Sequence, residues 1–88
     1  MRITAVASTT IATVAYDEAV ELLQLEFRNG SIYQYFGVPI AVHEGLLGAP
    51  SKGSYFNHVV RGTFRYHRVY QGGHQGAAGM LVAAGIPL

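Results

Sequence analysis

Two tyrosines separated by one residue stand in a strand-like stretch of this 88-residue chain. Tyr33 and Tyr35 lie within residues 31–36, whose β-branched and aromatic side chains suit a pleated sheet. Side chains two apart in a strand point to the same face, so the two rings lie side by side. On an exposed face they would form a platform on which nucleic-acid bases can stack, whereas on a buried face they would belong to the core.

The Asn-Gly turn at residues 29–30 is the strongest short hairpin signal in the chain, and it allows two registers. If the loop consists of these two residues alone, Glu26 lies opposite Tyr33 and Gln24 lies opposite Tyr35. The two tyrosines would then share the polar face of the hairpin and form the exposed platform.

A loop of three residues with a glycine bulge shifts the register by one position. Leu25 then lies opposite Tyr33, Leu23 lies opposite Tyr35, and both rings belong to the core. Because Gln34 occupies the other face of the strand, we favour this second register, with the tyrosine hydroxyls reaching the surface.

The segment Ser51-Lys52-Gly53-Ser54 stands where a helix is expected to begin, with Ser51 as its N-cap. Free backbone N–H groups at such a position favour an anion, Gly53 permits close approach, and Lys52 adds a positive charge. A phosphate would fit there, although an ordinary capped helix with a solvated lysine has the same residues.

Basic side chains gather in the second half of the chain. Residues 1–50 carry a net charge of −3, whereas residues 51–88 carry +4 and no acidic residue. Such a cluster can follow a phosphate backbone, but it can also be a solvated face or pair with the acidic half inside one fold. Besides Tyr33 and Tyr35, the residues we single out for nucleic-acid contact are Lys52, Gly53, Tyr55, Asn57, Arg61 and Arg65.

Neither a catalytic centre nor a metal site is indicated by the reactive side chains. Ser51, His58 and Glu44 can be named as nucleophile, base and orienting group, but no nucleophile elbow surrounds them. The four histidines, at positions 43, 58, 67 and 74, lack the spacing of a ligand pair. We therefore expect no enzyme activity, no metal ion and no cofactor.

The composition is typical of one small domain. Half of the residues are hydrophobic and the net charge is only +1, which excludes disorder throughout the chain. There is no cysteine, and therefore no disulfide or thiolate metal site. No signal-peptide pattern is visible, and the most apolar stretch, residues 77–86, has about half the length of a membrane-spanning helix. We expect a soluble, cytoplasmic protein that does not bind membranes.

Apolar periodicity predicts an α+β fold. Three strands of an antiparallel meander are expected at residues 11–16, 22–28 and 31–36. Pro39 suits the first turn of a short helix that Gly48 and Pro50 end, and a second helix is expected from Ser51 to Gly62. Both helices should pack on one face of the sheet, and residues 64–70 alternate again as a short last strand.

The composition changes after this last strand. Five glycines stand among Ala, Gln and His in the last 18 residues, without periodicity or charge. We therefore predict a domain over residues 1–70 and a Gly/Ala-rich flexible tail over residues 71–88.

Several short motifs follow one another in a fixed order between about residues 8 and 69. They are Ile11, Val14-x-Tyr16-Asp17, Leu25-x-Phe27-x-x-Gly30-x-x-Tyr33-x-Tyr35, Val38-Pro39, Ala49-Pro50-Ser51-Lys52-Gly53-x-Tyr55-Phe56-Asn57 and Arg61. Each motif alone is weak, but their joint order and spacing resemble the KTSC domain, with Pro50 as a small departure. This domain is named for the C-terminus of some lysyl-tRNA synthetases and also occurs as a small bacterial protein.

The resemblance implies RNA binding, since the domain is attached to an enzyme that handles tRNA. We therefore expect a small non-catalytic module that binds a tRNA-like RNA through its basic and aromatic side chains. The alternative is a module for protein–protein interaction or self-association, through a sheet edge or through the apolar tail. An enzyme is a distant third candidate.

Overall fold

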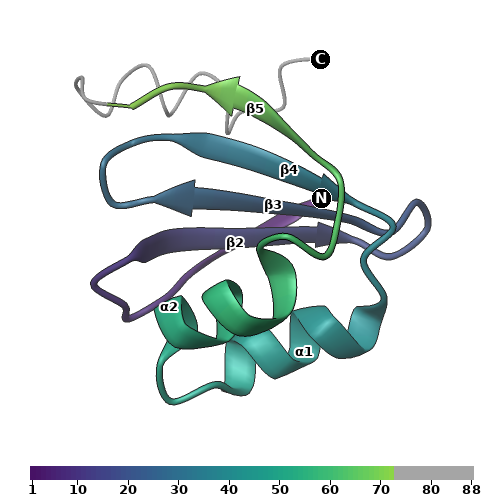
Figure 1. Cartoon of the computed structure of the whole chain (residues 1–88), viewed down its shortest axis with the longest axis horizontal. Coiled ribbons are helices and arrows are strands. Elements are labelled where there is room, and N and C mark those ends of the chain that lie inside the picture. The colour runs from purple at the N-terminus through teal and green to yellow at the C-terminus, as the bar shows by residue number, and fades with distance from the viewer. Residues whose placement is uncertain (73–88) are drawn as a thin grey trace.

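Five antiparallel strands form one sheet in which each strand pairs with the strands next to it along the chain (Figure 1). The computed structural model describes residues 1–72. The strands are β1 (Arg2–Ala5), β2 (Ile11–Asp17), β3 (Leu22–Phe27), β4 (Ile32–Phe36) and β5 (Tyr66–Tyr70). This arrangement confirms an α+β fold.

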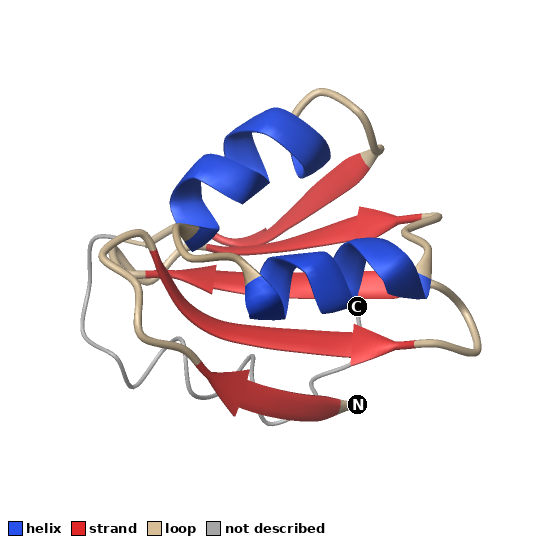
Figure 2. Cartoon of the chain, turned by 90° about the horizontal axis from the view of Figure 1, so that it is seen from below, coloured by secondary structure: helices blue, strands red, loops and turns tan. Residues whose placement is uncertain are grey.

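Three helical segments connect β4 to β5, and all of them lie on the same face of the sheet (Figure 2). They are α1 (Ile40–Gly48), α2 (Lys52–Tyr55) and the π-helical turn η1 (Phe56–Val60). Pro39 is the N-cap of α1, where its missing N–H costs nothing. The hydroxyl of Ser51 accepts the backbone N–H of Ser54 at 3.3 Å and so caps α2 as expected.

The core lies between this face of the sheet and the helices. β3 contributes the alternate residues Leu23 and Leu25, as a period of two requires. β2 contributes Ile11 and Val14, which lie three positions apart because the pairing of β2 with β3 shifts between Ile11 and Thr13. Tyr35 joins them from β4, and the helices contribute Leu46, Phe56 and Val60. The cluster of buried residues is Ile11, Val14, Leu23, Leu25, Tyr35, Val38, Leu46, Phe56 and Val60.

The predicted meander of three strands is wrong in its count, because four strands precede the helices. β1 is the additional strand, and it pairs Arg2 with Tyr16 and Ala5 with Thr13. All four of its residues are exposed, so it shows no alternation of buried and exposed side chains. An edge strand of this kind is stabilised by backbone pairing with its neighbour, which leaves no apolar pattern in the sequence.

The hairpin between β3 and β4 adopts the three-residue loop. Leu25 pairs with Tyr33 and Leu23 pairs with Tyr35, which is the second of the two registers considered above. The backbone N–H of Phe27 donates to Ser31 O at 2.8 Å, and Gly30 has a φ of +91°. A residue without Cβ is needed there, because this φ is strained for other residues.

The second predicted helix is divided in two and the last strand starts later than expected. After the single turn of α2, the backbone N–H of Arg61 donates to Phe56 O at 2.9 Å, five residues back. This π-type bond inserts one extra residue into the turn, and π-helical turns are frequent at functional sites. β5 begins at Tyr66 rather than at residue 64.

Two further predictions concern membrane-spanning helices and the tail. No helix within residues 1–72 is long and apolar enough to cross a membrane. The predicted tail falls almost wholly on residues 73–88, which lie outside the described residues.

Candidate functional site

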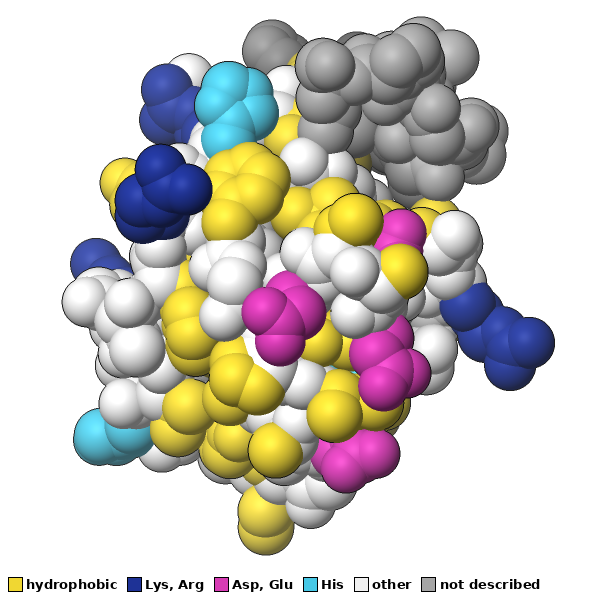
Figure 3. Space-filling model, turned by 90° about the vertical axis from the view of Figure 1, so that its right-hand side faces the viewer, with side chains coloured by type: hydrophobic (Ala, Val, Ile, Leu, Met, Phe, Trp, Pro, Cys, Tyr) yellow, Lys and Arg dark blue, Asp and Glu magenta, His cyan; other side chains and the backbone are white. Residues whose placement is uncertain are grey.

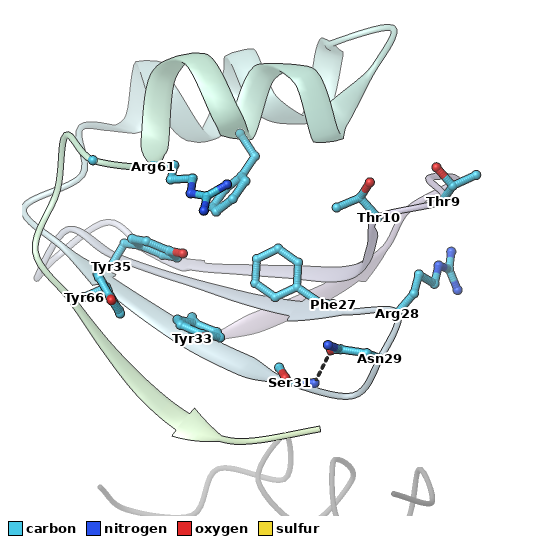
Figure 4. Close-up of a pocket in the computed structure, with 12 residues that line it drawn as sticks. Thr9, Thr10, Phe27, Arg28, Asn29, Ser31, Tyr33, Tyr35, Arg61 and Tyr66 are labelled. Carbon is cyan, nitrogen blue, oxygen red and sulfur yellow. Dashed lines mark hydrogen bonds between the residues drawn. The ribbon is translucent and has the colours of Figure 1, made fainter. Parts of the chain in front are cut away.

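A groove with a volume of about 610 Å³ opens between η1 and the sheet (Figure 4). β3, β4 and β5 supply its floor, η1 and the residues after it supply one wall, and the loop between β1 and β2 closes one end. The residues that line it are Thr9, Thr10, Phe27, Arg28, Asn29, Ser31, Tyr33, Tyr35, Phe56, Arg61, Gly62 and Tyr66. A volume of this size is typical of small-ligand sites.

Aromatic rings form most of the groove floor. The rings of Tyr33 and Tyr35 are stacked with their centroids 6.3 Å apart. Tyr66 pairs with Tyr35 across β4 and β5. Its ring centroid lies 5.5 Å from that of Tyr33 and 5.8 Å from that of Tyr35. Phe27 meets Tyr33 edge-on at 5.6 Å. We call Tyr33, Tyr35 and Tyr66 the tyrosine cluster.

The three members of the tyrosine cluster differ in exposure. Tyr35 is 4% exposed, Tyr33 is half-buried and Tyr66 is 61% exposed. Burial raises the pKa of Tyr35 far above its ordinary value, and the neighbouring Tyr33 and Tyr66 add to the rise. The hydroxyl of Tyr35 therefore stays protonated and can donate as well as accept hydrogen bonds.

An arginine lies at each end of the groove. Arg61, directly after the π-helical turn, is exposed, and its Nη1 lies 3.5 Å from Asn57 Oδ1. Arg28 is held more firmly, because its Nε donates to Ser8 O at 2.8 Å and its Nη2 donates to Val6 O at 2.9 Å. Arg28 thus fixes the loop between β1 and β2, whereas Arg61 is the freer cation.

The structure brings only part of the predicted contact set together. Tyr33, Tyr35 and Arg61 line the groove, and Asn57 lies beside Arg61. Arg65 borders a second hollow of about 700 Å³ next to the groove.

The other predicted residues have structural contacts outside the groove lining. The ammonium of Lys52 donates to Ala49 O at 2.9 Å. Gly53 packs against Thr10, so closely that a Cβ there would lie 2.7 Å from the threonine Oγ1. Tyr55 packs against Gly45 of α1. α2 has a single turn, and these contacts are those of a helix packed on its neighbours rather than of an anion site.

Sequence reasoning missed Tyr66, Phe27 and Arg28 as groove residues. The signal for Tyr66 was its place in the last strand, because pairing that strand with Tyr35 sets the two rings side by side. Phe27 and Arg28 flank the hairpin turn, and their role depends on the register of that turn. Phe27 belongs to one of the motifs that carry the family resemblance, but that motif does not assign it to a groove.

Within residues 1–72, the hydrogen bonds of Arg28, Lys52 and Arg61 go to oxygen atoms other than those of carboxylates. Arg28 and Lys52 donate to backbone carbonyls, and Arg61 lies beside an amide oxygen. Three of the five acidic residues, Asp17, Glu18 and Glu21, lie at the turn between β2 and β3. Figure 3 shows acidic side chains grouped near the middle of one side of the molecule, with basic and histidine side chains at its margin.

Of the three side chains considered for hydrolysis, Ser51 caps α2 and His58 lies against the local backbone. The Ser51 hydroxyl accepts the N–H of Ser54, and His58 Nδ1 lies 2.8 Å from Ser54 O. Among residues 1–72, no group of three His, Asp or Glu side chains lies close enough to hold a metal ion. His74 lies outside that part of the chain.

Known proteins resemble this chain over most of its described length. A lysine–tRNA ligase of Nostoc sp. is 46% identical over 59 residues, which cover 67% of this chain but 10% of the ligase. The chain thus spans about a tenth of that relative. An uncharacterized protein of Stutzerimonas stutzeri is 36% identical over 70 residues, covering 78% of this chain and 99% of that protein.

A solved structure and a family model match this chain as well. The crystal structure of a KTSC domain protein from Yersinia pestis matches with a TM-score of 0.76 and 33% identity, covering 78% of this chain and 97% of that one. The family model of the KTSC domain matches residues 7–71. The chain therefore belongs to the KTSC domain family.

Proposed function

We propose that this protein is a small RNA-binding module that holds unpaired nucleotides in the aromatic groove. The observation that carries the proposal is the tyrosine cluster facing a groove with the exposed Arg61 at its rim. A base can stack on the aromatic rings while its phosphate meets the guanidinium, which is how proteins commonly hold single-stranded nucleic acid.

The shape of the groove favours an unpaired base over a duplex. Most of its aromatic residues lie on the floor, beneath the wall formed by η1, and a base must leave its own stack to reach them (Figure 4). Tyr33 and Tyr66 also bring hydroxyls that can bond to base edges or to the ribose. Unpaired loops and ends of RNA meet these requirements.

Charge supports a polyanionic ligand. Lys52, Arg61, Arg65 and Arg68 are the charged residues after position 50, and none of the five acidic residues lies in that part of the chain. Among the described residues, Arg61 is hydrogen-bonded to an amide oxygen and not to a carboxylate, which leaves its charge available to a phosphate. Four cations give a weak footprint, so stacking has to supply much of the affinity.

Relatives support RNA over other ligands. A segment of lysine–tRNA ligase is 46% identical to this chain, and that enzyme acts on tRNA. The present chain covers a tenth of the ligase, so it would share the handling of RNA and not the ligase reaction. RNA that presents unpaired nucleotides, such as tRNA, is therefore the ligand class that we propose.

The test is fluorescence polarisation of the full chain against labelled tRNA, a single-stranded RNA and the same RNA as a duplex. We expect binding of the first two at physiological salt and weaker binding of the duplex. Replacing Arg61 with Gln should weaken binding and reduce the salt slope by about 0.7, the value for one phosphate contact of a single strand.

Arg2→Gln is the matched control, because it removes the same charge from the exposed strand β1, outside the groove lining. It should leave the affinity and the salt slope unchanged. Binding that vanishes at physiological salt, or equal effects of Arg2→Gln and Arg61→Gln, would reduce the basic side chains to a solvated face. In that case a protein partner becomes the better hypothesis.

A further inference from the structure

The groove continues past Tyr66 into a second hollow of about 700 Å³. This hollow is lined by Phe36, Gly62, Thr63, Phe64, Arg65 and Tyr66. Gly62 and Tyr66 border both spaces, so the two form a continuous surface that passes over the start of β5.

Each space has its own arginine and its own aromatic residues. Arg61 lines the groove together with Tyr33 and Tyr35. Arg65 lines the second hollow together with Phe36, which is 39% exposed. The backbone N–H of Phe36 donates to Arg65 O at 2.9 Å, so the two are joined across the end of the sheet. The second space thus repeats the composition of the first.

Tyr66 is the residue that the two spaces share, and its exposure is unusual. It is 61% exposed, although an aromatic residue normally buries most of its area. Its ring packs against Tyr33 and Tyr35 on the groove side and also borders the second hollow. Packing within the described residues therefore leaves much of this ring available for a ligand.

Gly62 allows the chain to place the two arginines in adjacent spaces. Its φ of +80° turns the backbone sharply between η1 and β5, in a conformation that favours glycine. Within residues 1–72, no neighbouring atom lies within 4 Å of the position that a Cβ of Gly62 would occupy, so the wall is open at this point between the two spaces.

We propose that the site holds two consecutive nucleotides, one base in the groove and the next in the hollow beside Phe36, with Tyr66 between them. This inference rests on the proposed function and extends it from a single base to a dinucleotide step. Arg61 binds the phosphate of the first nucleotide, and Arg65 binds the phosphate that joins it to the second.

The experiment compares adenosine monophosphate with the dinucleotide pApA, using NMR chemical shifts of the full-length protein. We expect both to bind and pApA to bind about tenfold more tightly, because Arg65 binds the joining phosphate and so holds a second base in the hollow beside Phe36. Arg65→Gln should remove most of this difference, because it should weaken the binding of pApA much more than the binding of adenosine monophosphate. Arg2→Gln serves as the control and should change neither affinity.

Two outcomes would overturn the inference, and they can be told apart. If adenosine monophosphate binds and pApA binds no more tightly, the groove holds one base and only the second subsite is wrong. If neither ligand shifts any resonance and the longer single-stranded RNA also fails to bind, the proposed function falls together with it. Tyr66→Phe, which keeps the ring, should retain the difference, whereas Tyr66→Leu should lose it.

Discussion

At the scale of single residues, His43 is a titratable side chain whose pKa is shifted by its packing. Its ring stacks on Tyr16 with centroids 4.6 Å apart and planes within 11°. The Tyr16 hydroxyl donates to Val38 O, which joins this pair to the segment before α1. Burial lowers the pKa of His43 below its ordinary value of 6.5, and Glu44 beside it offsets part of that shift.

Acid should destabilise the protein through His43. A lowered pKa means that the unfolded chain binds the proton more readily, so the contribution to stability is present above pH 6.5 and is lost as the pH falls through the lowered value. We expect the urea concentration at the unfolding midpoint to be lower at about pH 5.5 than at about pH 7.5. His43→Gln should reduce this fall. An undiminished fall in the variant would assign the pH effect to other groups.

The residue types in the sequence predicted part of the site. Whether each of these residues is buried or faces the groove depends on how far the helices cover the sheet. The sequence allowed Tyr33 and Tyr35 to form either an exposed platform or part of the core. The observed register places both of them on the face of the sheet that bears the helices. Even so, only Tyr35 is fully buried, because the groove remains open above Tyr33. How far a helix extends over a sheet depends on tertiary packing, which no periodicity in the sequence encodes.

At the scale of elements, the contact between α2 and the loop before β2 depends on a glycine. A Cβ at Gly53 would lie 2.7 Å from Thr10 Oγ1, closer than real Cβ atoms approach, and at a tight 3.1 Å from the Cβ of Thr10. We expect Gly53→Ala to lower the free energy of unfolding by about 1–2 kcal/mol, because the clash outweighs the gain in helix propensity. Urea unfolding followed by circular dichroism measures this change.

Gly48→Ala is the matched control for this substitution. Gly48 is also helical, in α1, and nothing lies within 4 Å of the position of its Cβ. Its replacement should leave stability unchanged or raise it by about 0.5 kcal/mol. If Gly53→Ala is equally harmless yet weakens RNA binding, Gly53 serves ligand approach, as the sequence first suggested, and not packing.

Elements with a strong local signal were predicted well. The alternation in β3, the Asn-Gly turn, Pro39 before α1 and the Ser51 cap all correspond to observed features. β1 escaped prediction because it is an exposed edge strand held by backbone pairing with β2. The π-helical turn before Arg61 also has no sequence signature, since it differs from an α-helix by one inserted residue.

At the scale of the whole molecule, the relatives indicate how much of the chain the fold requires. The family match ends at residue 71, and 99% of the Stutzerimonas stutzeri protein aligns with 78% of this chain. The last described residue, Gly72, belongs to the packed structure. Its N–H donates to Ser31 Oγ at 2.8 Å, and its backbone lies against Asn29.

A chain that ends at Gly72 is therefore expected to fold and to bind RNA as the full chain does. Its thermal midpoint should stay within a few degrees of the full-length value, about the effect of less than 1 kcal/mol in a domain of this size. Ending the chain at Tyr70 instead removes the hydrogen bond to Ser31 and should lower the thermal midpoint further.

Light scattering on the full chain and on the chain ending at Gly72 tests the alternative function, self-association. A dimer that becomes a monomer on removal of residues 73–88 would favour it. Loss of cooperative unfolding in the chain ending at Gly72 would instead make residues 73–88 part of the folded domain, against the predicted boundary.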